Sequence, residues 1–220
     1  MIEALVVVDF DGTLTLRDVG DEICDRFADP SWRDEERALA RREVSMVAAQ
    51  SRMWPLVRAS PDALEAHVRA VGTLRSGAAE LLDAGAAGEI DLVLASGGFD
   101  FYIEQLLAPW IERHAFRARY ANRGRPEAGS VSVSFPHDDL RCAYCAVCKG
   151  RVVQRHRDGR PVVFVGDGVT DLCGARVASE VFAIRGGALA SLAREEGIET
   201  TVIDTLWPVL ERLRAIGHAR

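Results

Sequence analysis

The chain has 220 residues, enough for one hydrophobic core with an inserted subdomain, and its 48% apolar and 27% charged residues are ordinary for a globular protein. The net charge of −6 argues against a nucleic-acid partner, because a phosphate backbone needs a basic surface. The apolar runs are far shorter than the ~20 residues that span a bilayer, and no basic segment opens the chain. We therefore expect no membrane contact, no signal peptide and a cytoplasmic location.

Short, apolar, β-branched runs recur along the chain and predict strands that are buried on both faces. They are Leu5–Phe10, Ile90–Ser96, Val162–Gly166, Val181–Ile184 and Thr201–Ile203. The stretches between them predict helices at Ala78–Ala84, Gly98–Ile111, Gly150–Arg157, Thr170–Ser179 and Leu206–Ile216. Because strands and helices alternate, we expect an α/β fold with a doubly wound, mostly parallel, Rossmann-like sheet.

Two segments break this alternation. The first has no strand pattern: Asp34–Arg52 predicts one charged helix, and Ser60-Pro61 predicts the capped start of another. About fifty helical residues are too many for a crossover of ~12, so residues 17–72 predict an inserted helical cap, with the core formed by 1–16 and 73–220. The second is an edge hairpin around Ser130–Phe135, which with the cysteine-rich run after it covers about 117–149.

Polar residues follow several of the predicted strands. Asp9 and Asp11 follow the first strand, Ser96 and Gly97 end the second, and Asp167 and Asp171 follow a later one. Lys149, the only lysine in the chain, opens a helix that leads to the same edge. In an open α/β sheet ligands bind at the carboxyl ends of the strands, so we expect these seven residues to meet there. The alternative is that Asp, Ser and Gly only form surface turns.

Four carboxylates at one place repel one another unless a cation lies between them. Oxygen ligands favour Mg²⁺, which commonly binds together with a phosphate. Lys149 and the backbone N–H groups around Ser96 and Gly97 would then contact phosphoryl oxygens. Gly12 allows the chain to bend beside the bound group.

This set of motifs resembles the haloacid dehalogenase-like phosphatases over essentially the whole chain. The matching residues are Asp9-Phe10-Asp11-Gly12-Thr13, Ser96-Gly97-Gly98, Lys149 and Gly166-Asp167-Gly168-Val169-Thr170-Asp171. The resemblance implies that Asp9 attacks phosphorus to give an aspartyl phosphate and that Asp11 is the general acid and base. It also implies that Asp9, Asp11 (through its carbonyl), Asp167 and Asp171 form the Mg²⁺ site, and that Ser96 and Lys149 bind phosphate.

Within that superfamily the chain is similar to the phosphoserine phosphatase branch, and more so to the 2-hydroxy-3-keto-5-methylthiopentenyl-1-phosphate phosphatases of methionine salvage. The second likeness rests on three stretches: Phe27–Trp32, Ser96–Tyr102, and Phe135-Pro136-His137 with the cysteines after it. It implies a small phosphorylated metabolite as substrate, with phosphoserine as the alternative. The protein would be a monomer or a homodimer.

Several cap residues are candidates for the substrate pocket. Trp32, Met53 and Trp54 could line it for an apolar tail, but a small core of the cap is the interpretation we favour. Asp18, Asp21 and Glu22 either face the cleft or only cap a helix.

The cysteine-rich run offers a second metal site. His137, Cys142, Cys145 and Cys148 have the spacing H-x4-C-x2-C-x2-C, which suits a structural Zn²⁺ site. The alternative, which we favour here, is a group of free thiols in a reducing compartment. Cys24 and Cys173 are expected to be small buried residues.

Three other functions compete with the phosphatase. A dinucleotide site at Gly166 and Gly168 would lack its third glycine, because Asp171 stands there. A phospho-accepting signalling module would lack the fifty-residue cap. A non-catalytic phosphate-binding protein would not need the complete set of charged residues.

Overall fold

Apolar strands form the centre of the fold, in one seven-stranded sheet of order β4-β3-β2-β1-β5-β6-β7. The computed structural model describes residues 5–217. The strands are β1 Leu5–Val8, β2 Asp91–Phe99, β3 Ala118–Glu127, β4 Ser130–Ser134, β5 Val162–Gly166, β6 Glu180–Ile184 and β7 Thr201–Ile203. All neighbours pair in parallel except β3 and β4. The predicted α/β class with a mostly parallel sheet is confirmed.

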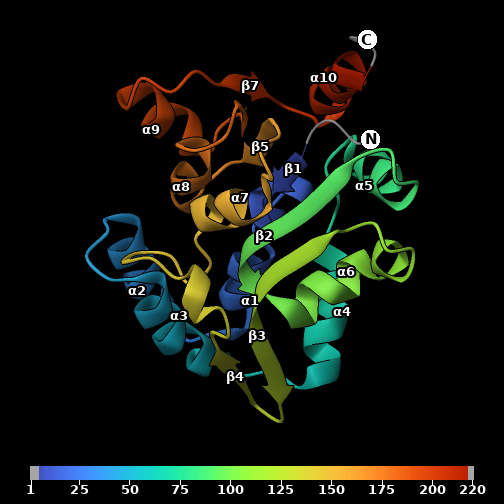
Figure 1. The fold of residues 1–220 in the computed structure, drawn as a ribbon. Coiled ribbons are helices and arrows are strands. Elements are labelled where there is room, and N and C mark those ends of the chain that lie inside the picture. The colour runs from blue at the N-terminus through green and yellow to red at the C-terminus, as the bar shows by residue number, and fades with distance from the viewer. Residues whose placement is uncertain (1–4, 218–220) are drawn as a thin grey trace.

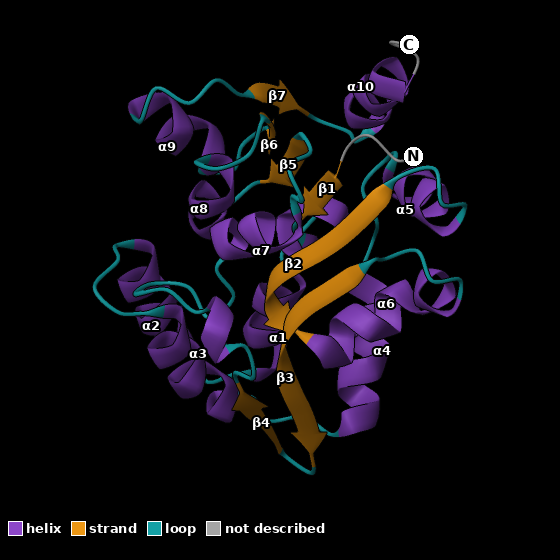
Figure 2. Cartoon of the chain, in the orientation of Figure 1, coloured by secondary structure: helices purple, strands orange, loops and turns teal. Residues whose placement is uncertain are grey.

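Helices cover both faces of the sheet (Figure 2). Along β1, Val6 and Val8 pack on one face with α5 (Ala78–Ala86), α6 (Asp100–Glu112) and α10 (Trp207–Gly217). Leu5 and Val7 pack on the other face with α7 (Lys149–His156), α8 (Leu172–Ala175) and α9 (Leu189–Glu195). Successive residues of a strand point to opposite faces, so burial on both sides requires the unbroken apolar runs seen in the sequence.

Four helices lie between β1 and α5: α1 Val19–Phe27, α2 Trp32–Ala40, α3 Met46–Met53 and α4 Pro61–Val71. The single helix predicted over Asp34–Arg52 is wrong, because α2 and α3 are separate and Arg42 between them has a positive φ of 59°. Ser60 caps α4 as predicted, since its hydroxyl accepts a hydrogen bond of 3.2 Å from the Ala63 N–H. In Figure 1, α2 and α3 lie at the lower left, beyond the carboxyl end of β2. We propose that residues 17–72 act as a cap on the core formed by residues 1–16 and 73–220. Residues 1–4 and 218–220 of the proposed core lie outside the part of the chain that the structure describes.

The edge hairpin is formed by β3 and β4, which pair antiparallel from Glu127↔Ser130 to Arg123↔Ser134. The sequence predicts this hairpin but places Arg125–Glu127 in its turn, whereas they belong to β3. The turn itself is Ala128-Gly129, and Gly129 has a φ of +79°.

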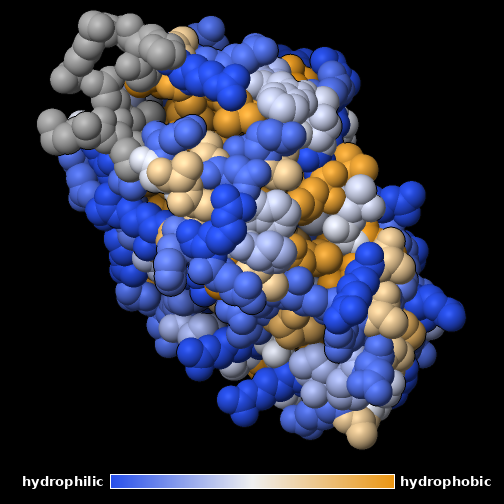
Figure 3. All heavy atoms as spheres, turned by 90° about the vertical axis from the view of Figure 1, so that its right-hand side faces the viewer, coloured by the Kyte–Doolittle hydropathy of each residue, from blue (hydrophilic) through white to orange (hydrophobic). Residues whose placement is uncertain are grey.

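The surface seen in Figure 3 is mostly hydrophilic, with small separated apolar areas. Among the described residues, the large apolar side chains with clear exposure are Leu16, Val202 and Trp207. Within residues 5–217, no helix combines the length and the apolar character that a membrane crossing requires.

Candidate active site

The predicted residues meet at the carboxyl ends of the strands. Asp9 follows β1, Ser96 and Gly97 lie in β2, Asp167 follows β5, and Lys149 is the first residue of α7. Together with Asp11 they line one pocket of about 310 Å³, which also includes residues of α1, α2 and α3. Asp171 is fully buried directly behind this pocket.

Lys149 holds two of the carboxylates. Its Nζ lies 2.9 Å from Asp9 Oδ1, forms an ion pair with Asp171, and is 3.3 Å from the Thr170 hydroxyl. Burial alone would lower the pKa of Lys149, but the charges of Asp171 and Asp9 outweigh burial and raise it. Lys149 is therefore a buried permanent cation beside Asp9.

Asp171 organises the loop after β5. Its Oδ2 accepts hydrogen bonds from the backbone N–H groups of Asp167 (3.0 Å) and Gly168 (2.8 Å), while its Oδ1 faces Lys149. Both oxygens are thus engaged. This arrangement favours a role in holding Lys149 and the loop over a role as a direct metal ligand.

Asp11 has different partners from Asp9. Its Oδ2 accepts a hydrogen bond of 2.8 Å from the Tyr102 hydroxyl, and its Oδ1 accepts one of 2.9 Å from the Val19 N–H. Burial and the charges of Asp18 and Asp9 raise the pKa of Asp11 well above its ordinary value, against the effect of these two hydrogen bonds. A carboxyl group with a raised pKa can retain a proton and act as an acid.

The turn after β1 depends on a glycine. Gly12 has a φ of +69°, and a Cβ at this position would lie 2.5 Å from Asp167 Oδ2. The turn is also held by Thr13, whose hydroxyl donates to Asp167 Oδ1 (3.1 Å), and by Arg75, which donates to the carbonyls of Thr13 and Gly12. Position 12 therefore requires glycine for two reasons: the Asp167 carboxylate leaves no space for a Cβ, and the backbone has a positive φ.

The segment Ser96-Gly97 is fixed from two sides. The Ser96 hydroxyl oxygen accepts a hydrogen bond of 2.9 Å from the Gly98 N–H. The Gly97 carbonyl accepts hydrogen bonds from Asn122 Nδ2 (2.7 Å) and from Gln50 Nε2 of α3 (3.0 Å). Gln50 thereby joins the helical segment to the core at the edge of the pocket.

Three carboxylates meet where a metal ion could lie, with Asp9 and Asp167 as its ligands and Asp171 behind them. Asp9, Asp167 and Asp171 each offer an oxygen, and these oxygens lie within 4.8 Å of one another. Burial and the charge of Asp171 raise the pKa of Asp9 well above its ordinary value. The same two causes raise the pKa of Asp167 to about 6. Such mutual repulsion is what a hard divalent cation relieves, so this donor set fits Mg²⁺.

The helical segment contributes acidic and apolar walls to the pocket. Asp18 and Asp21 line it, and Asp18 also caps α1 by accepting a hydrogen bond of 2.8 Å from the Asp21 N–H. Glu22 instead forms an ion pair with Arg17. Trp32, Met53 and Trp54 all belong to the hydrophobic core, as favoured from the sequence, and Met53 and Trp54 also line the pocket.

Some residues of the site have no role in the sequence-based prediction. Tyr102 and Gln50 line the pocket, and Asn122 and Arg75 hold its loops; their hydrogen bonds connect segments that are far apart in the chain. Glu36 and Tyr144 also line the pocket.

The predicted zinc ligands do not all meet. His137 Nε2 is 3.0 Å from the Ala121 carbonyl, and its ring packs against Tyr120. Cys142 and Cys148 instead lie close to Cys173 of α8. The expectation that Cys173 is only a small buried residue is also wrong, because it is partly exposed and belongs to this thiol group.

Comparison with known proteins agrees with this geometry. A family model described as haloacid dehalogenase-like hydrolase matches residues 6–176. The 2-hydroxy-3-keto-5-methylthiopentenyl-1-phosphate phosphatase of Brevibacillus brevis is 28% identical over 213 residues and 94% of each chain, and the one of Bacillus cereus is 27% identical over 215 residues and 96% of each chain.

Among solved structures, a substrate-bound phosphoserine phosphatase has a similar fold, with a TM-score of 0.71 at 18% identity over 96% of this chain and 99% of that one. At this low sequence identity, the similarity shows that the two proteins share a fold and no more. The family match extends over most of the chain and includes the Asp9, Ser96, Lys149 and Asp167 segments. The chain therefore belongs to the haloacid dehalogenase-like hydrolase family.

Proposed function

We propose that the protein is a Mg²⁺-dependent phosphatase that hydrolyses a small phosphomonoester through an aspartyl phosphate on Asp9. One observation carries this proposal: a buried carboxylate at the end of β1 faces a buried lysine at 2.9 Å and has two further carboxylates within reach of a shared cation. The phosphatase relatives support the reaction type.

The two carboxylates of the first motif have separate roles. Asp9 attacks phosphorus, the bond to the ester oxygen breaks, and Asp11 donates its proton to the leaving alkoxide. Asp11 then takes a proton from a water molecule, which attacks phosphorus and releases Asp9 and inorganic phosphate. Lys149 and Ser96 hold phosphoryl oxygens during both steps.

Magnesium would be held by Asp9, Asp167 and the Asp11 carbonyl. When bound, it would favour the ionised form of Asp9 and neutralise phosphoryl charge. Asp171 contributes by fixing Lys149 and the loop that carries Asp167.

We propose 2-hydroxy-3-keto-5-methylthiopentenyl-1-phosphate, a methionine-salvage metabolite, as the substrate. The relatives in Brevibacillus brevis and Bacillus cereus are named as phosphatases of this compound, and their similarity to this chain extends over nearly their full length. The pocket suits a small molecule, and Met46, Met53 and Trp54 provide soft apolar contacts for a thioether.

Phosphoserine is the second candidate, supported by the similar fold of phosphoserine phosphatase. Asp18, Asp21 and Glu36 would attract its ammonium group. Its carboxylate, however, would meet these same acidic groups, and none of the described side chains that line the pocket is an arginine. This charge distribution favours the substrate without a carboxylate.

The test is a screen of phosphorylated metabolites that includes both candidates, ranked by kcat/KM, with and without EDTA. We expect hydrolysis that EDTA abolishes and a preference for the thioether substrate. Asp9→Asn is expected to retain the fold, checked by circular dichroism, and to lose almost all turnover. Wild-type turnover in Asp9→Asn would exclude the covalent mechanism, and better activity on phosphoserine would reverse the substrate assignment.

A further inference from the structure

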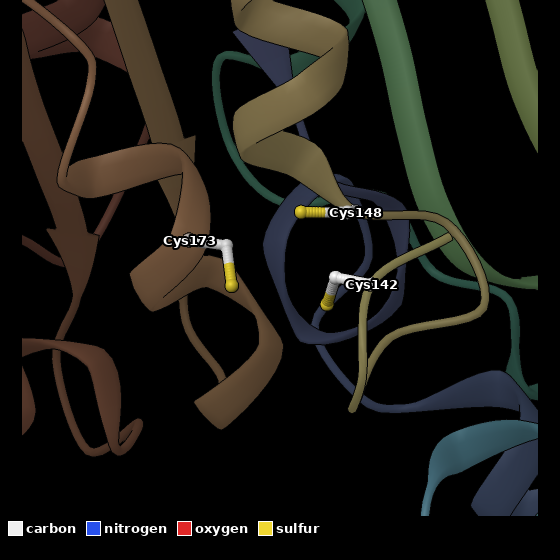
Figure 4. A group of neighbouring side chains, drawn as sticks. All are labelled: Cys142, Cys148 and Cys173. Carbon is white, nitrogen blue, oxygen red and sulfur yellow. The ribbon is translucent and has the colours of Figure 1, made fainter. Parts of the chain in front are cut away.

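Three cysteines from two separate segments lie together beside the active site. Cys142 lies in the loop after β4, Cys148 directly precedes α7, and Cys173 lies in α8. Their sulfur atoms all lie within 4.8 Å of one another. Figure 4 shows the three side chains turned toward a common space between these segments.

A fourth cysteine lies next to this group. Cys145 is fully buried, and interaction with the thiols of Cys148 and Cys173 raises the pKa of its own thiol. Its backbone N–H also donates a hydrogen bond of 3.2 Å to Cys142 Sγ. Three sulfur atoms therefore lie together, and Cys145 lies beside them with its backbone N–H facing Cys142.

We propose that Cys142, Cys145, Cys148 and Cys173 form a structural zinc site. Zinc binds four thiolates as a tetrahedron with Zn–S bonds of about 2.3 Å, which places the sulfur atoms about 3.8 Å apart. The sulfurs of Cys142, Cys148 and Cys173, which lie within 4.8 Å of one another, would need small adjustments to reach this geometry, and Cys145 would turn its thiol toward them as the fourth ligand. Cys142-x2-Cys145-x2-Cys148 has the short spacing typical of such sites, with Cys173 as the distant ligand in place of His137.

The surroundings suit the charge of the complex. Four thiolates and one Zn²⁺ carry two net negative charges, and binding releases the thiol protons to solvent. Arg176, three residues after Cys173, pairs with Glu196 and adds a cation near the group. The N-terminus of α7 at Cys148 adds the positive end of a helix dipole.

Zinc at this place would connect the two segments that carry the buried ion pair. Cys148 directly precedes Lys149, and Cys173 follows Asp171 by two residues. The backbone of α7 already packs closely on α8, because a Cβ on Gly150 would collide with the Cys173 carbonyl oxygen. The ion would hold Lys149 and Asp171 in register from behind the pocket, without contact with substrate.

The test measures zinc in the purified full-length protein by inductively coupled plasma mass spectrometry, after growth with added zinc and removal of loose metal. We expect about one zinc ion per chain for the wild type and for His137→Ala, and a large loss for Cys173→Ser. A zinc-free wild type, or a Cys173→Ser variant that keeps full zinc, overturns the proposal. No substrate is involved, so this result is independent of the proposed phosphatase activity.

Reconstitution of the wild type with Co²⁺ gives a second readout in case Cys173→Ser does not fold. A tetrahedral cobalt–thiolate site produces sulfur-to-metal absorption in the near ultraviolet and intense visible bands, which we expect. Absence of both bands overturns the proposal, as does a disulfide among these four cysteines in the protein purified without reductant, detected by mass spectrometry.

Discussion

Asp9 and Asp11 are separated by one residue, yet their carboxyl groups meet different surroundings. Asp9 faces the cation of Lys149, which supports an ionised nucleophile. Asp11 faces the Tyr102 hydroxyl and a backbone N–H, in a buried position that raises its pKa. A nucleophile and an acid require opposite protonation states. Burial raises the pKa of both groups, but Lys149 lowers that of Asp9, whereas Asp11 has no cation beside it among the causes that shift its pKa.

Tyr102 is predicted to be a positioning residue for Asp11. Tyr102→Phe removes the hydroxyl that donates to Asp11 Oδ2 at 2.8 Å and leaves the ring in place. We expect kcat to fall about tenfold, the equivalent of ~1.4 kcal/mol, with little change in KM. The pH profile of kcat should also shift, because this hydrogen bond lowers the pKa of Asp11.

Phe101→Leu is the matched control, since it changes an aromatic residue of α6 that packs on the Tyr102 ring and has no hydroxyl to donate to Asp11. If Tyr102→Phe and Phe101→Leu change kcat equally and neither shifts the pH profile, Tyr102 acts only through packing.

Asp21 is predicted to make stability depend on pH. Enclosure in the pocket and the charges of Asp18 and Glu36 raise the pKa of Asp21 from 3.8 to about 8. The folded state then holds this proton more tightly than the unfolded state, so the contribution of Asp21 to stability falls as pH rises from about 4 to about 8. Asp21→Asn should remove this dependence.

We therefore expect the Tm of Asp21→Asn to rise relative to the Tm of the wild type as the pH increases from about 5 to about 9. Thermal melts across this range provide the measurement. Glu112→Gln, which removes an exposed carboxylate at the end of α6, controls for the loss of charge. A Tm difference that stays constant with pH contradicts the assignment.

At the scale of elements, the central strands are predicted best because they are buried on both faces. β1, β5 and β6 differ from prediction by at most two residues at an end, because a two-sided core permits only apolar side chains. β7 also has the predicted bounds, although Thr201 and Val202 are exposed. The prediction includes the edge hairpin but gives no bounds for β3, since its ten residues ARYANRGRPE are largely polar and its position is set by pairing with β2 and β4. Tertiary pairing, rather than local pattern, determines that strand.

The same distinction applies to the candidate site. Residues within strand-end motifs, such as Asp9, Ser96 and Asp167, are predicted because topology brings strand ends together. Tyr102 and Cys173 are not, because each lies in a helix whose pattern is explained by packing. Their approach to Asp11 and to Cys148 depends on helix positions that local sequence does not encode.

We predict that adding a methyl group at Gly150, where α7 packs against α8, destabilises the protein. A Cβ on Gly150 would overlap the Cys173 carbonyl oxygen, so Gly150→Ala must move one helix away from the other. Alanine normally favours a helix by about 1 kcal/mol, but we expect a net loss of about 1–3 kcal/mol in the free energy of unfolding. Urea denaturation measures this difference.

Gln154→Ala, at an exposed position of the same helix, is the control and should be neutral or slightly stabilising. Because Lys149 is adjacent, Gly150→Ala should also lower kcat, whereas Gln154→Ala should not. A Gly150→Ala variant more stable than the wild type would show that the helices have room to adjust.

At the scale of the molecule, the pocket is formed by segments that are distant in the chain. The core supplies the carboxylates and Lys149, and α1–α3 supply the opposite wall. Several contacts join the parts; among them, Gln50 donates to the Gly97 carbonyl, and the Met46 N–H donates to the Tyr144 carbonyl at 2.8 Å. The loop with Cys142, Cys145 and Cys148 thus contacts the cap.

The carboxylates around Lys149 lead to a prediction for the stability of the whole protein. Asp9, Asp167 and Asp171 repel one another, and a bound Mg²⁺ would relieve that repulsion in the folded state alone. At a Mg²⁺ concentration about ten times its Kd, linkage adds about 1.4 kcal/mol to the free energy of unfolding. For a chain of this size we expect a rise in Tm of about 3–6 °C.

Differential scanning fluorimetry with increasing MgCl₂ measures this rise, with NaCl at equal ionic strength as the control for screening. Asp167→Asn keeps the size of the side chain but removes one ligand, so its Tm should respond much less to Mg²⁺. If the wild type and Asp167→Asn respond equally, magnesium does not bind at these carboxylates. The pocket would then need another source of positive charge beside Lys149 to accept a phosphoryl group.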